Sequence, residues 1–167
     1  MSGVSKEFIS GVSLTREETE IFKKKKPWGV IFFKRNILSE KQLKKLTSSI
    51  KKTMKDKKYP ILIDEEGGRV TRLSNFLNNS IYSQKYFNDI YKIDKKVGLR
   101  LYKHYIDSIS LHLRNLGINI NTTPVLDLYQ KKANGIIGNR SFSANSTSVN
   151  EMGQACVKFY KNNKIAT

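Results

Sequence analysis

The chain has 167 residues, enough for one domain with a hydrophobic core and short for two. Hydrophobic residues make up 38% and charged residues 27%, a balance typical of a folded chain rather than a disordered one. The single cysteine, Cys156, excludes an internal disulfide and a metal site built from several thiolates. No apolar run approaches the roughly 18 residues of a membrane span, and no basic-then-apolar leader opens the sequence. These features predict a cytoplasmic protein without a membrane partner.

The net charge of +17 admits two interpretations. Clustered lysines could bind nucleic acid or another anionic surface. However, the lysines fall mostly on the polar faces or ends of predicted helices, without interleaved aromatic residues on which bases could stack. The sequence is also rich in Asn and Ile, which like Lys have AT-rich codons. We therefore favour coding bias and solubility, expect no nucleic-acid partner, and keep a basic nucleic-acid-binding protein as an alternative.

The first predicted helix begins at Thr15, which has capping-box spacing to Glu18, and ends in the lysines before Pro27. Lysines suit that end because the helix dipole is negative there. The apolar run 29–33 follows and has the length and composition of a parallel strand buried on both faces.

The second predicted helix begins with Ser39 and Gln42 and ends before Tyr59-Pro60. Its apolar positions recur every three to four residues and mark one core face: Leu43, Leu46, Ile50 and Met54. Residues 61–64 form the second predicted strand, and a loop over 65–79 comes after it.

The third predicted helix is capped by Asp94 and stopped by Gly117. Its predicted core stripe is Val97, Leu101, Tyr105, Ile109, Leu113 and Leu116. A third short strand covers 118–121. After a long loop over 122–146, Ser148 caps a last helix, with Glu151 three residues on, and 164–167 begins a fourth strand.

Strands that alternate with helices predict a parallel sheet with right-handed crossovers. The loops after the strands are long and those after the helices short, as in a (β/α) barrel whose ligands bind at the carboxyl ends of the strands. An eight-stranded barrel needs about 250 residues. We therefore predict an α/β fold that is the N-terminal half of a (β/α)8 TIM-type barrel, about three and a half βα units, with 1–167 as one partial domain.

The segment 64–72, D-E-E-G-G-R-V-T-R, concentrates charge at the end of the second strand. Carboxylates there are costly to bury unless they are paired, the glycines permit close backbone approaches, and the arginines offer planar donor groups. A ligand-binding loop and a structural ion-pair turn explain this pattern equally well. A Walker-type phosphate loop is excluded because its motif does not occur.

This segment, extended to I-D-E-E-G-G-R-V-T-R-L, resembles the I-D-Q-E-G-G-R-V-x-R-L signature of bacterial glycoside hydrolase family 3 β-N-acetylhexosaminidases. Other segments resemble the same N-terminal domain in the same order: G-V-I-F-F-K-R-N-I at 29–37, I-N-T-T-P-V-L-D at 120–127 and I-I-G-N-R-S-F at 136–142. The L-T-x-E-E start of the first helix also fits. The resemblance thus covers nearly the whole chain.

The resemblance implies a role for each matched residue. Asp64 should accept hydrogen bonds from the hydroxyls of a bound N-acetylglucosamine. Arg72 and Arg140 should hold the sugar or its acyl and peptide-bearing portion. Asp127 should face the same pocket, although it could equally orient Arg140 or close the loop. Glu65 departs from the usual Gln and should point away from the substrate. No metal or organic cofactor is implied.

The family enzymes retain anomeric configuration through a covalent intermediate on an aspartate, and in this subgroup a mobile-loop histidine is the acid and base. That histidine follows a K-H-x-P-G-H-G segment, so both residues are expected beyond Thr167. His104 and His112 are interpreted as surface or packing residues of a helix, and Cys156 as a small apolar one.

We therefore expect a substrate-binding half that does not hydrolyse glycosides alone. The parent reaction implied is release of terminal N-acetylglucosamine from peptidoglycan fragments during peptidoglycan recycling. The expected partners are an N-acetylglucosamine-containing saccharide or muropeptide and, because a half-barrel exposes a sheet edge, a C-terminal half chain or a second copy. A non-catalytic sugar-binding remnant is the alternative.

Overall fold

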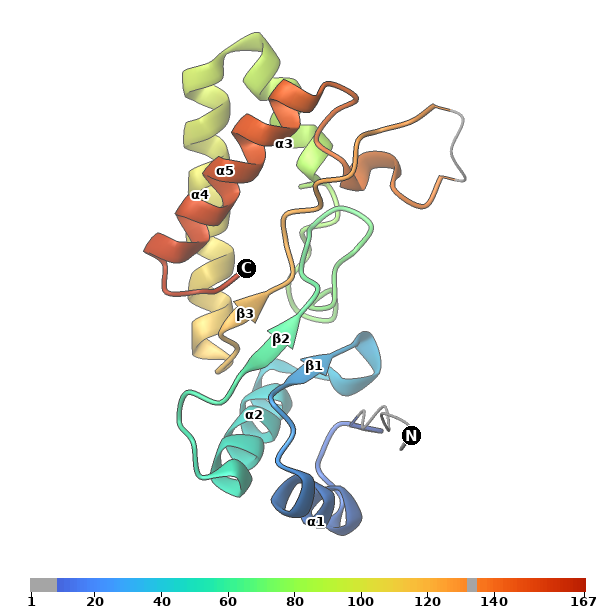
Figure 1. Cartoon of the computed structure of the whole chain (residues 1–167), viewed down its shortest axis with the longest axis vertical. Helices are drawn as coiled ribbons and strands as arrows, with labels where there is room; N and C mark the ends of the chain where they lie inside the picture. Colours follow the sequence, from blue (N-terminus) through green and yellow to red (C-terminus); the bar gives the residue numbers. More distant parts are fainter. Residues whose placement is uncertain (1–8, 132–134) are drawn as a thin grey trace.

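A parallel three-stranded sheet forms the centre of the molecule, which we describe from a computed structural model over residues 9–131 and 135–167 (Figure 1). Its strands are β1 (Val30–Phe32), β2 (Ile61–Ile63) and β3 (Ile120–Asn121), in the order β1-β2-β3. Val30 pairs with Ile61, and Ile63 pairs with Asn121. The predicted parallel sheet is therefore confirmed, although each strand is shorter than its apolar run.

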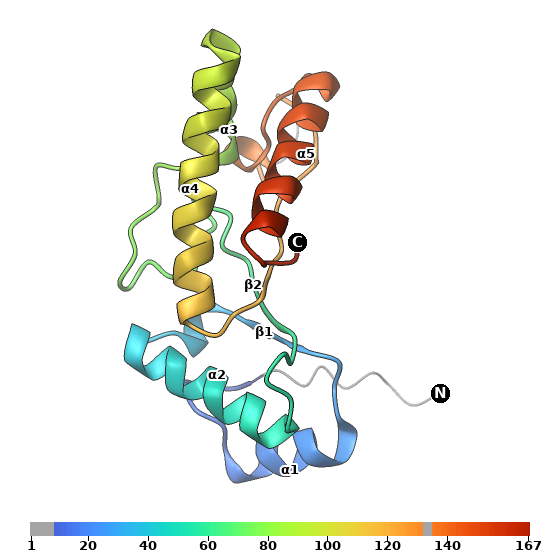
Figure 2. The ribbon, with the colours of Figure 1, turned by 90° about the vertical axis from the view of Figure 1, so that its left-hand side faces the viewer.

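Five helices connect and cover these strands in the part of the chain that the structure describes. They are α1 (Arg16–Lys25), α2 (Glu40–Met54), α3 (Gln84–Ile93), α4 (Lys95–Asn115) and α5 (Ser146–Asn162), with short 3-10 turns η1 (Lys34–Asn36) and η2 (Gly138–Arg140). Helices α1 and α2 lie beside β1 and β2 at one end of the molecule, whereas α3, α4 and α5 pack together at the other (Figures 1 and 2).

The predicted helix starts are mostly confirmed by their caps. Thr15 and Glu18 form a capping box at α1, Ser39 accepts from the Gln42 N–H at α2, and Asp94 caps α4. The prediction of Ser148 as the cap of the last helix is wrong. The cap of α5 is Asn145, whose side chain accepts from the Ser148 N–H, so Ser148 lies inside the first turn.

Two features of the α3–α4 region differ from the sequence analysis. No helix was predicted over 84–93, yet α3 forms there with Ser83 as its cap. The predicted stripe of α4 is partly wrong, because Leu101 is 41% exposed. The buried residues of α4 are Gly98, Tyr102, Ile106, Ile109, Ser110 and Leu113. This face is rotated because α4 packs against both α3 and α5, rather than against the sheet alone.

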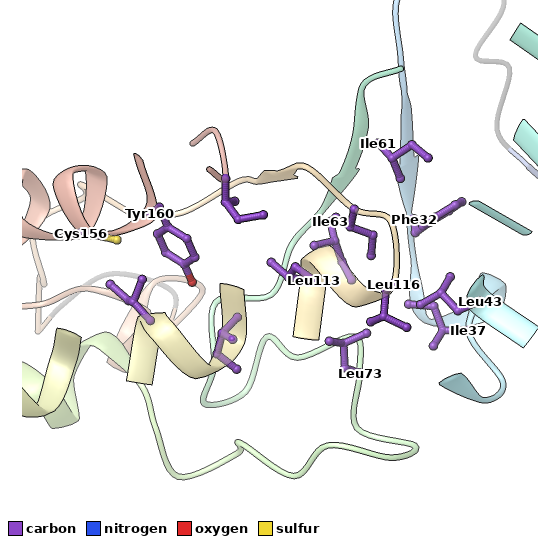
Figure 3. Packing of buried hydrophobic residues seen from close by; sticks show 14 of the residues in the cluster. Phe32, Ile37, Leu43, Ile61, Ile63, Leu73, Leu113, Leu116, Cys156 and Tyr160 are labelled. Atoms are coloured by element: carbon purple, nitrogen blue, oxygen red, sulfur yellow. The ribbon is translucent and has the colours of Figure 1, made fainter. Parts of the chain in front are cut away.

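The hydrophobic core joins the sheet to the helices on both sides. Ile61 and Ile63 of the central strand are fully buried and lie near Phe32, Leu43 and Leu116 (Figure 3). Burial of such a side chain stabilises the fold by about 1.5–3 kcal/mol. Because β2 lies in the middle of this core, the residue that follows it, Asp64, has a fixed position.

The predicted fourth strand appears as a single parallel bridge between Ile120 and Ala166. The Asn121 N–H donates to the Ala166 carbonyl, and the Ala166 N–H donates to the Asn119 carbonyl, both at 2.9 Å. Three strands and this bridge agree with the predicted half-barrel. Among the described helices, none is long and apolar enough to cross a membrane.

A buried asparagine ties the two strand ends together. Asn121 is fully buried, accepts from the Glu65 N–H at 2.9 Å and donates to the Glu65 carbonyl at 2.9 Å and to the Tyr160 hydroxyl at 3.0 Å. The Asn121 side chain therefore satisfies the backbone N–H and carbonyl of Glu65, which lies two residues beyond the end of β2.

Asn121→Ala is expected to lower the free energy of unfolding by about 3 kcal/mol, because it leaves the buried Glu65 N–H and carbonyl without partners. Urea unfolding of the purified chain measures this change. Asn150→Ala is the matched control: Asn150 is exposed and accepts from Gln154 alone among the described side chains, so its effect should stay within about 0.5 kcal/mol. Equal effects at the two positions would contradict the assignment.

Candidate functional site

The turn after β2 requires glycine at two successive positions. Gly67 and Gly68 have φ angles of +80° and +62°. A Cβ on Gly67 would lie 2.3 Å from the Tyr82 carbonyl oxygen, and one on Gly68 would lie 2.8 Å from the Ser83 Cβ. The glycines thus let the backbone turn back and rest against 82–83. This close approach fixes the direction in which the flanking carboxylates leave the strand.

Glu65 is fully buried and organises the turn from within. Its Oε1 accepts from the Thr71 hydroxyl at 2.7 Å and from the Asn79 amide at 2.6 Å. Its Oε2 accepts from the Arg72 and Leu73 N–H groups at 2.7 and 2.9 Å. Four donors satisfy the carboxylate, so it can be buried without a cation. The side chain points into the turn, whereas the Asp64 side chain is partly exposed; the orientation of Glu65 relative to a substrate stays a prediction.

Asp64 and Arg72, both predicted site residues, are brought together at the carboxyl end of β2. Arg72 Nη2 donates to Asp64 Oδ2 at 2.9 Å. The Arg72 side chain remains 26% exposed and that of Asp64 23% exposed. Asp64 Oδ1 accepts from the Thr122 hydroxyl, which sequence reasoning missed. The Arg72 guanidinium also lies 5.9 Å from the centre of the Phe33 ring, and its buried Nε has no partner among the described residues. The pair is held firmly but is still open to a ligand.

Arg140 approaches the same turn from the long loop after β3. Its Nε donates to Glu66 Oε2 and its Nη2 donates to Glu66 Oε1, each at 2.8 Å. This bidentate geometry is the strong form of an arginine–carboxylate pair. The hydrogen bonds with Glu66 raise the pKa of Arg140 above its usual value. The structure therefore places Arg140 at the site with one edge of its guanidinium already occupied by Glu66.

Asp127, the remaining predicted site residue, is exposed. Its backbone carbonyl accepts from the Ser141 hydroxyl at 2.6 Å, which closes the loop. Its charge also contributes to the raised pKa of Arg140. The loop contact is made by the Asp127 backbone, so the alternatives predicted for its side chain, orienting Arg140 or closing the loop, stay predictions. The sugar-binding roles of all four residues stay predictions.

Sequence reasoning also missed Gln84, the first residue of α3. Its amide donates to the Val125 carbonyl at 2.9 Å and the Arg140 carbonyl at 2.6 Å, and its oxygen accepts from the Val125 N–H at 2.9 Å. Gln84 therefore fixes both arms of the loop over 122–146. The cap residue Ser83 was a signal for a helix here, but no local pattern predicts contacts with residues more than forty positions away.

The titratable groups elsewhere do not reach this site. His104 is exposed on α4, and His112 lies in the last turn of α4. Cys156 is buried in α5, and burial raises the pKa of its thiol to about 12, so it is no nucleophile at neutral pH. Among residues 9–131 and 135–167, no group of three His, Cys, Asp or Glu side chains is placed to hold a metal ion.

The fold and the site together define the N-terminal part of a parallel (β/α) barrel with a cluster of paired charges at the carboxyl ends of its strands. Residues 5–167 match the model of the glycosyl hydrolase family 3 N terminal domain. The chain belongs to this family.

The relatives that the chain matches include beta-hexosaminidases. It is 31% identical over 149 residues to the Bordetella pertussis protein, covering 88% of this chain and 41% of that one. It is 30% identical over 158 residues to the Methylobacillus flagellatus protein, and this match covers 95% of this chain and 44% of that protein. The chain thus spans less than half the length of these relatives.

Solved structures show the same likeness. NagZ from Neisseria gonorrhoeae in complex with N-trifluoroacetyl-D-glucosamine superposes with a TM-score of 0.82 at 29% identity, over 93% of this chain and 45% of NagZ. A family 3 beta-N-acetylglucosaminidase from Paenibacillus superposes with a TM-score of 0.80 at 24% identity, over 99% of this chain and 32% of that one. This likeness supports the fold.

Glu65→Ala is expected to lower the free energy of unfolding by about 3 kcal/mol, because it leaves buried donors of the turn without an acceptor. Glu20→Ala is the matched control, since Glu20 forms an exposed pair with Lys23 worth at most about 1 kcal/mol. Urea unfolding of both variants measures the difference, and a Glu65→Ala protein as stable as the control would show that the Glu65 side chain does not organise the turn.

Proposed function

We propose that this chain supplies the N-acetylglucosamine-binding half of a family 3 β-N-acetylhexosaminidase. The observation that carries the proposal is the Asp64–Arg72 pair, which remains about one-quarter exposed at the carboxyl end of the central strand. The names of the curated relatives and the N-acetylglucosamine analogue bound to NagZ support the choice of sugar.

The pair can hold a sugar by simple hydrogen bonding. A carboxylate is an acceptor with about four lone-pair positions, and Asp64 has committed only two of them, to Arg72 and Thr122, among the described residues. Sugar hydroxyls can donate to the remaining positions. The Arg72 guanidinium holds the carboxylate in place, and Glu65 in turn fixes the Arg72 backbone, so the acceptor is oriented before the ligand arrives.

The whole enzyme, in this proposal, removes terminal N-acetylglucosamine from peptidoglycan fragments in the cytoplasm with retention of configuration. Retention requires a nucleophile and an acid–base group on the two sides of the glycosidic bond. Each carboxylate at the end of β2 already has a partner. Asp64 is paired with Arg72 and Glu66 with Arg140, and Glu65 accepts hydrogen bonds from the turn. The 167-residue chain therefore binds the sugar without cleaving it, and the rest of the barrel completes the reaction.

Calorimetric titration of the 167-residue chain with N-acetylglucosamine is expected to show saturable binding. Asp64→Ala and Arg72→Met should each weaken the affinity at least tenfold, about 1.4 kcal/mol, because each removes one member of the pair. Asp107→Ala is the matched control, an aspartate paired with Lys103 on α4, and should bind like the parent. A parent chain without saturable binding, or equal binding by all variants, would contradict the proposal.

A further inference from the structure

One end of the molecule concentrates the positive charge of the chain. Residues 14–60, which contain α1 and α2, hold 15 Lys and Arg against 5 Asp and Glu, a net charge of +10 out of the total of +17. Figures 1 and 2 show these two helices together at one end, where they pack on each other. Eleven lysines of this segment are exposed: four at 23–26, four along α2 and three in the turn over 55–58.

Most of these charges have no acidic neighbour. Lys23 pairs with Glu20 and Lys44 with Glu40, whereas the other nine exposed lysines form no ion pair with a carboxylate of the described residues. Together they create a positive potential that concentrates anions at this end of the molecule. Coding bias explains the number of lysines in the chain, but it does not explain their gathering at one end.

An exposed tryptophan lies within this charged segment. Trp28, in the connection between α1 and β1, is 73% exposed. The connection is fixed against the turn that precedes β2, because the Tyr59 hydroxyl donates to the Pro27 carbonyl at 2.8 Å. The lysines at 23–26 therefore flank Trp28 along the chain, and those of the turn over 55–58 flank it through this contact.

This surface lies at the opposite end of the strands from the candidate site. Trp28 and the turn over 55–58 precede β1 and β2, whereas Asp64 follows β2. Because the strands are parallel, their amino ends lie on one side of the sheet and their carboxyl ends on the other. A partner bound at the amino ends therefore leaves Asp64 uncovered.

We infer that Trp28 and the exposed lysines of 23–26, α2 and the turn over 55–58 form a surface that binds an anionic lipid bilayer. Tryptophan rings are enriched at the headgroup level of membranes, and each lysine near an anionic leaflet strengthens binding about fivefold. A peripheral surface of this kind needs no apolar span, and the prediction of no membrane partner rested on the absence of such a span.

Nucleic acid is the other polyanion to consider, and the structure favours lipid. Single strands are held by several aromatic rings on which successive bases stack. Trp28 is the one exposed aromatic residue of 14–60, since Phe22, Phe32 and Tyr59 are buried and Phe33 is half-buried. A single ring among lysines suits an interfacial anchor better. The inference does not rest on the identity of the sugar.

The test uses the fluorescence of Trp28, the only tryptophan in the sequence. Vesicles of equal parts phosphatidylglycerol and phosphatidylcholine should shift its emission to shorter wavelength, because the ring leaves water for the headgroup region. Vesicles of phosphatidylcholine alone should leave the emission unchanged. Molar salt should release the chain from the anionic vesicles, because it screens the lysines.

Lys57→Glu/Lys58→Glu should weaken binding to the anionic vesicles at least tenfold, since two cations are replaced by two anions. Lys158→Glu/Lys161→Glu is the matched control: it makes the same change of net charge at exposed positions of α5, at the other end of the molecule, and should bind like the parent. Trp28→Ala, followed by cosedimentation with the vesicles, should weaken binding about tenfold. The melting temperatures should stay unchanged, because all five side chains are exposed.

Four results would overturn the inference. Two are an equal emission shift on both kinds of vesicle and no shift on the anionic ones. The third is a control variant that binds as weakly as Lys57→Glu/Lys58→Glu, which would reduce the effect to net charge. The fourth is a single-stranded oligonucleotide that binds through the same two lysines while the vesicles do not. Asp64→Ala should bind the vesicles like the parent, so failure of sugar binding is a separate result.

Discussion

The arrangement of the site depends on one buried carboxylate. Glu65 is fully buried, and its carboxylate accepts four hydrogen bonds, from Thr71, Asn79 and the Arg72 and Leu73 backbone. All four donors come from residues 71–79, so the Glu65 side chain ties the end of β2 to the returning arm of the turn. The position of Arg72, and through it the orientation of Asp64, follows from this interaction.

Three successive carboxylates thus have three different tasks because they leave the strand in different directions. Asp64 points to the exposed side and meets Arg72, Glu65 points inward, and Glu66 meets Arg140 from the loop after β3. Each charge is paired or hydrogen-bonded, which limits the cost of placing them at the end of a buried strand. These contacts hold the charged side chains at the end of β2 in defined positions.

Local patterns in the sequence predict much of the fold and little of this network. Strand runs and capping residues such as Thr15 and Asp94 act within a few residues, so they are visible in the sequence. The Glu66–Arg140 pair and the contacts of Gln84 join residues far apart in the chain, and no local pattern reports them. Asp64, Arg72 and Arg140 were predicted as a group through family resemblance, whereas their actual partners required the structure.

The central claim is that the Asp64–Arg72 pair binds an N-acetylated sugar in a chain that carries part of the barrel. Nuclear magnetic resonance of the 167-residue chain, titrated with N-acetylglucosamine, tests this most directly because it reports every amide. Binding at the Asp64–Arg72 pair should shift the amide signals of 64–72, Thr122 and Arg140 and leave the others in place. Shifts centred on the lysines of α2, or no shifts at saturating sugar, would contradict it.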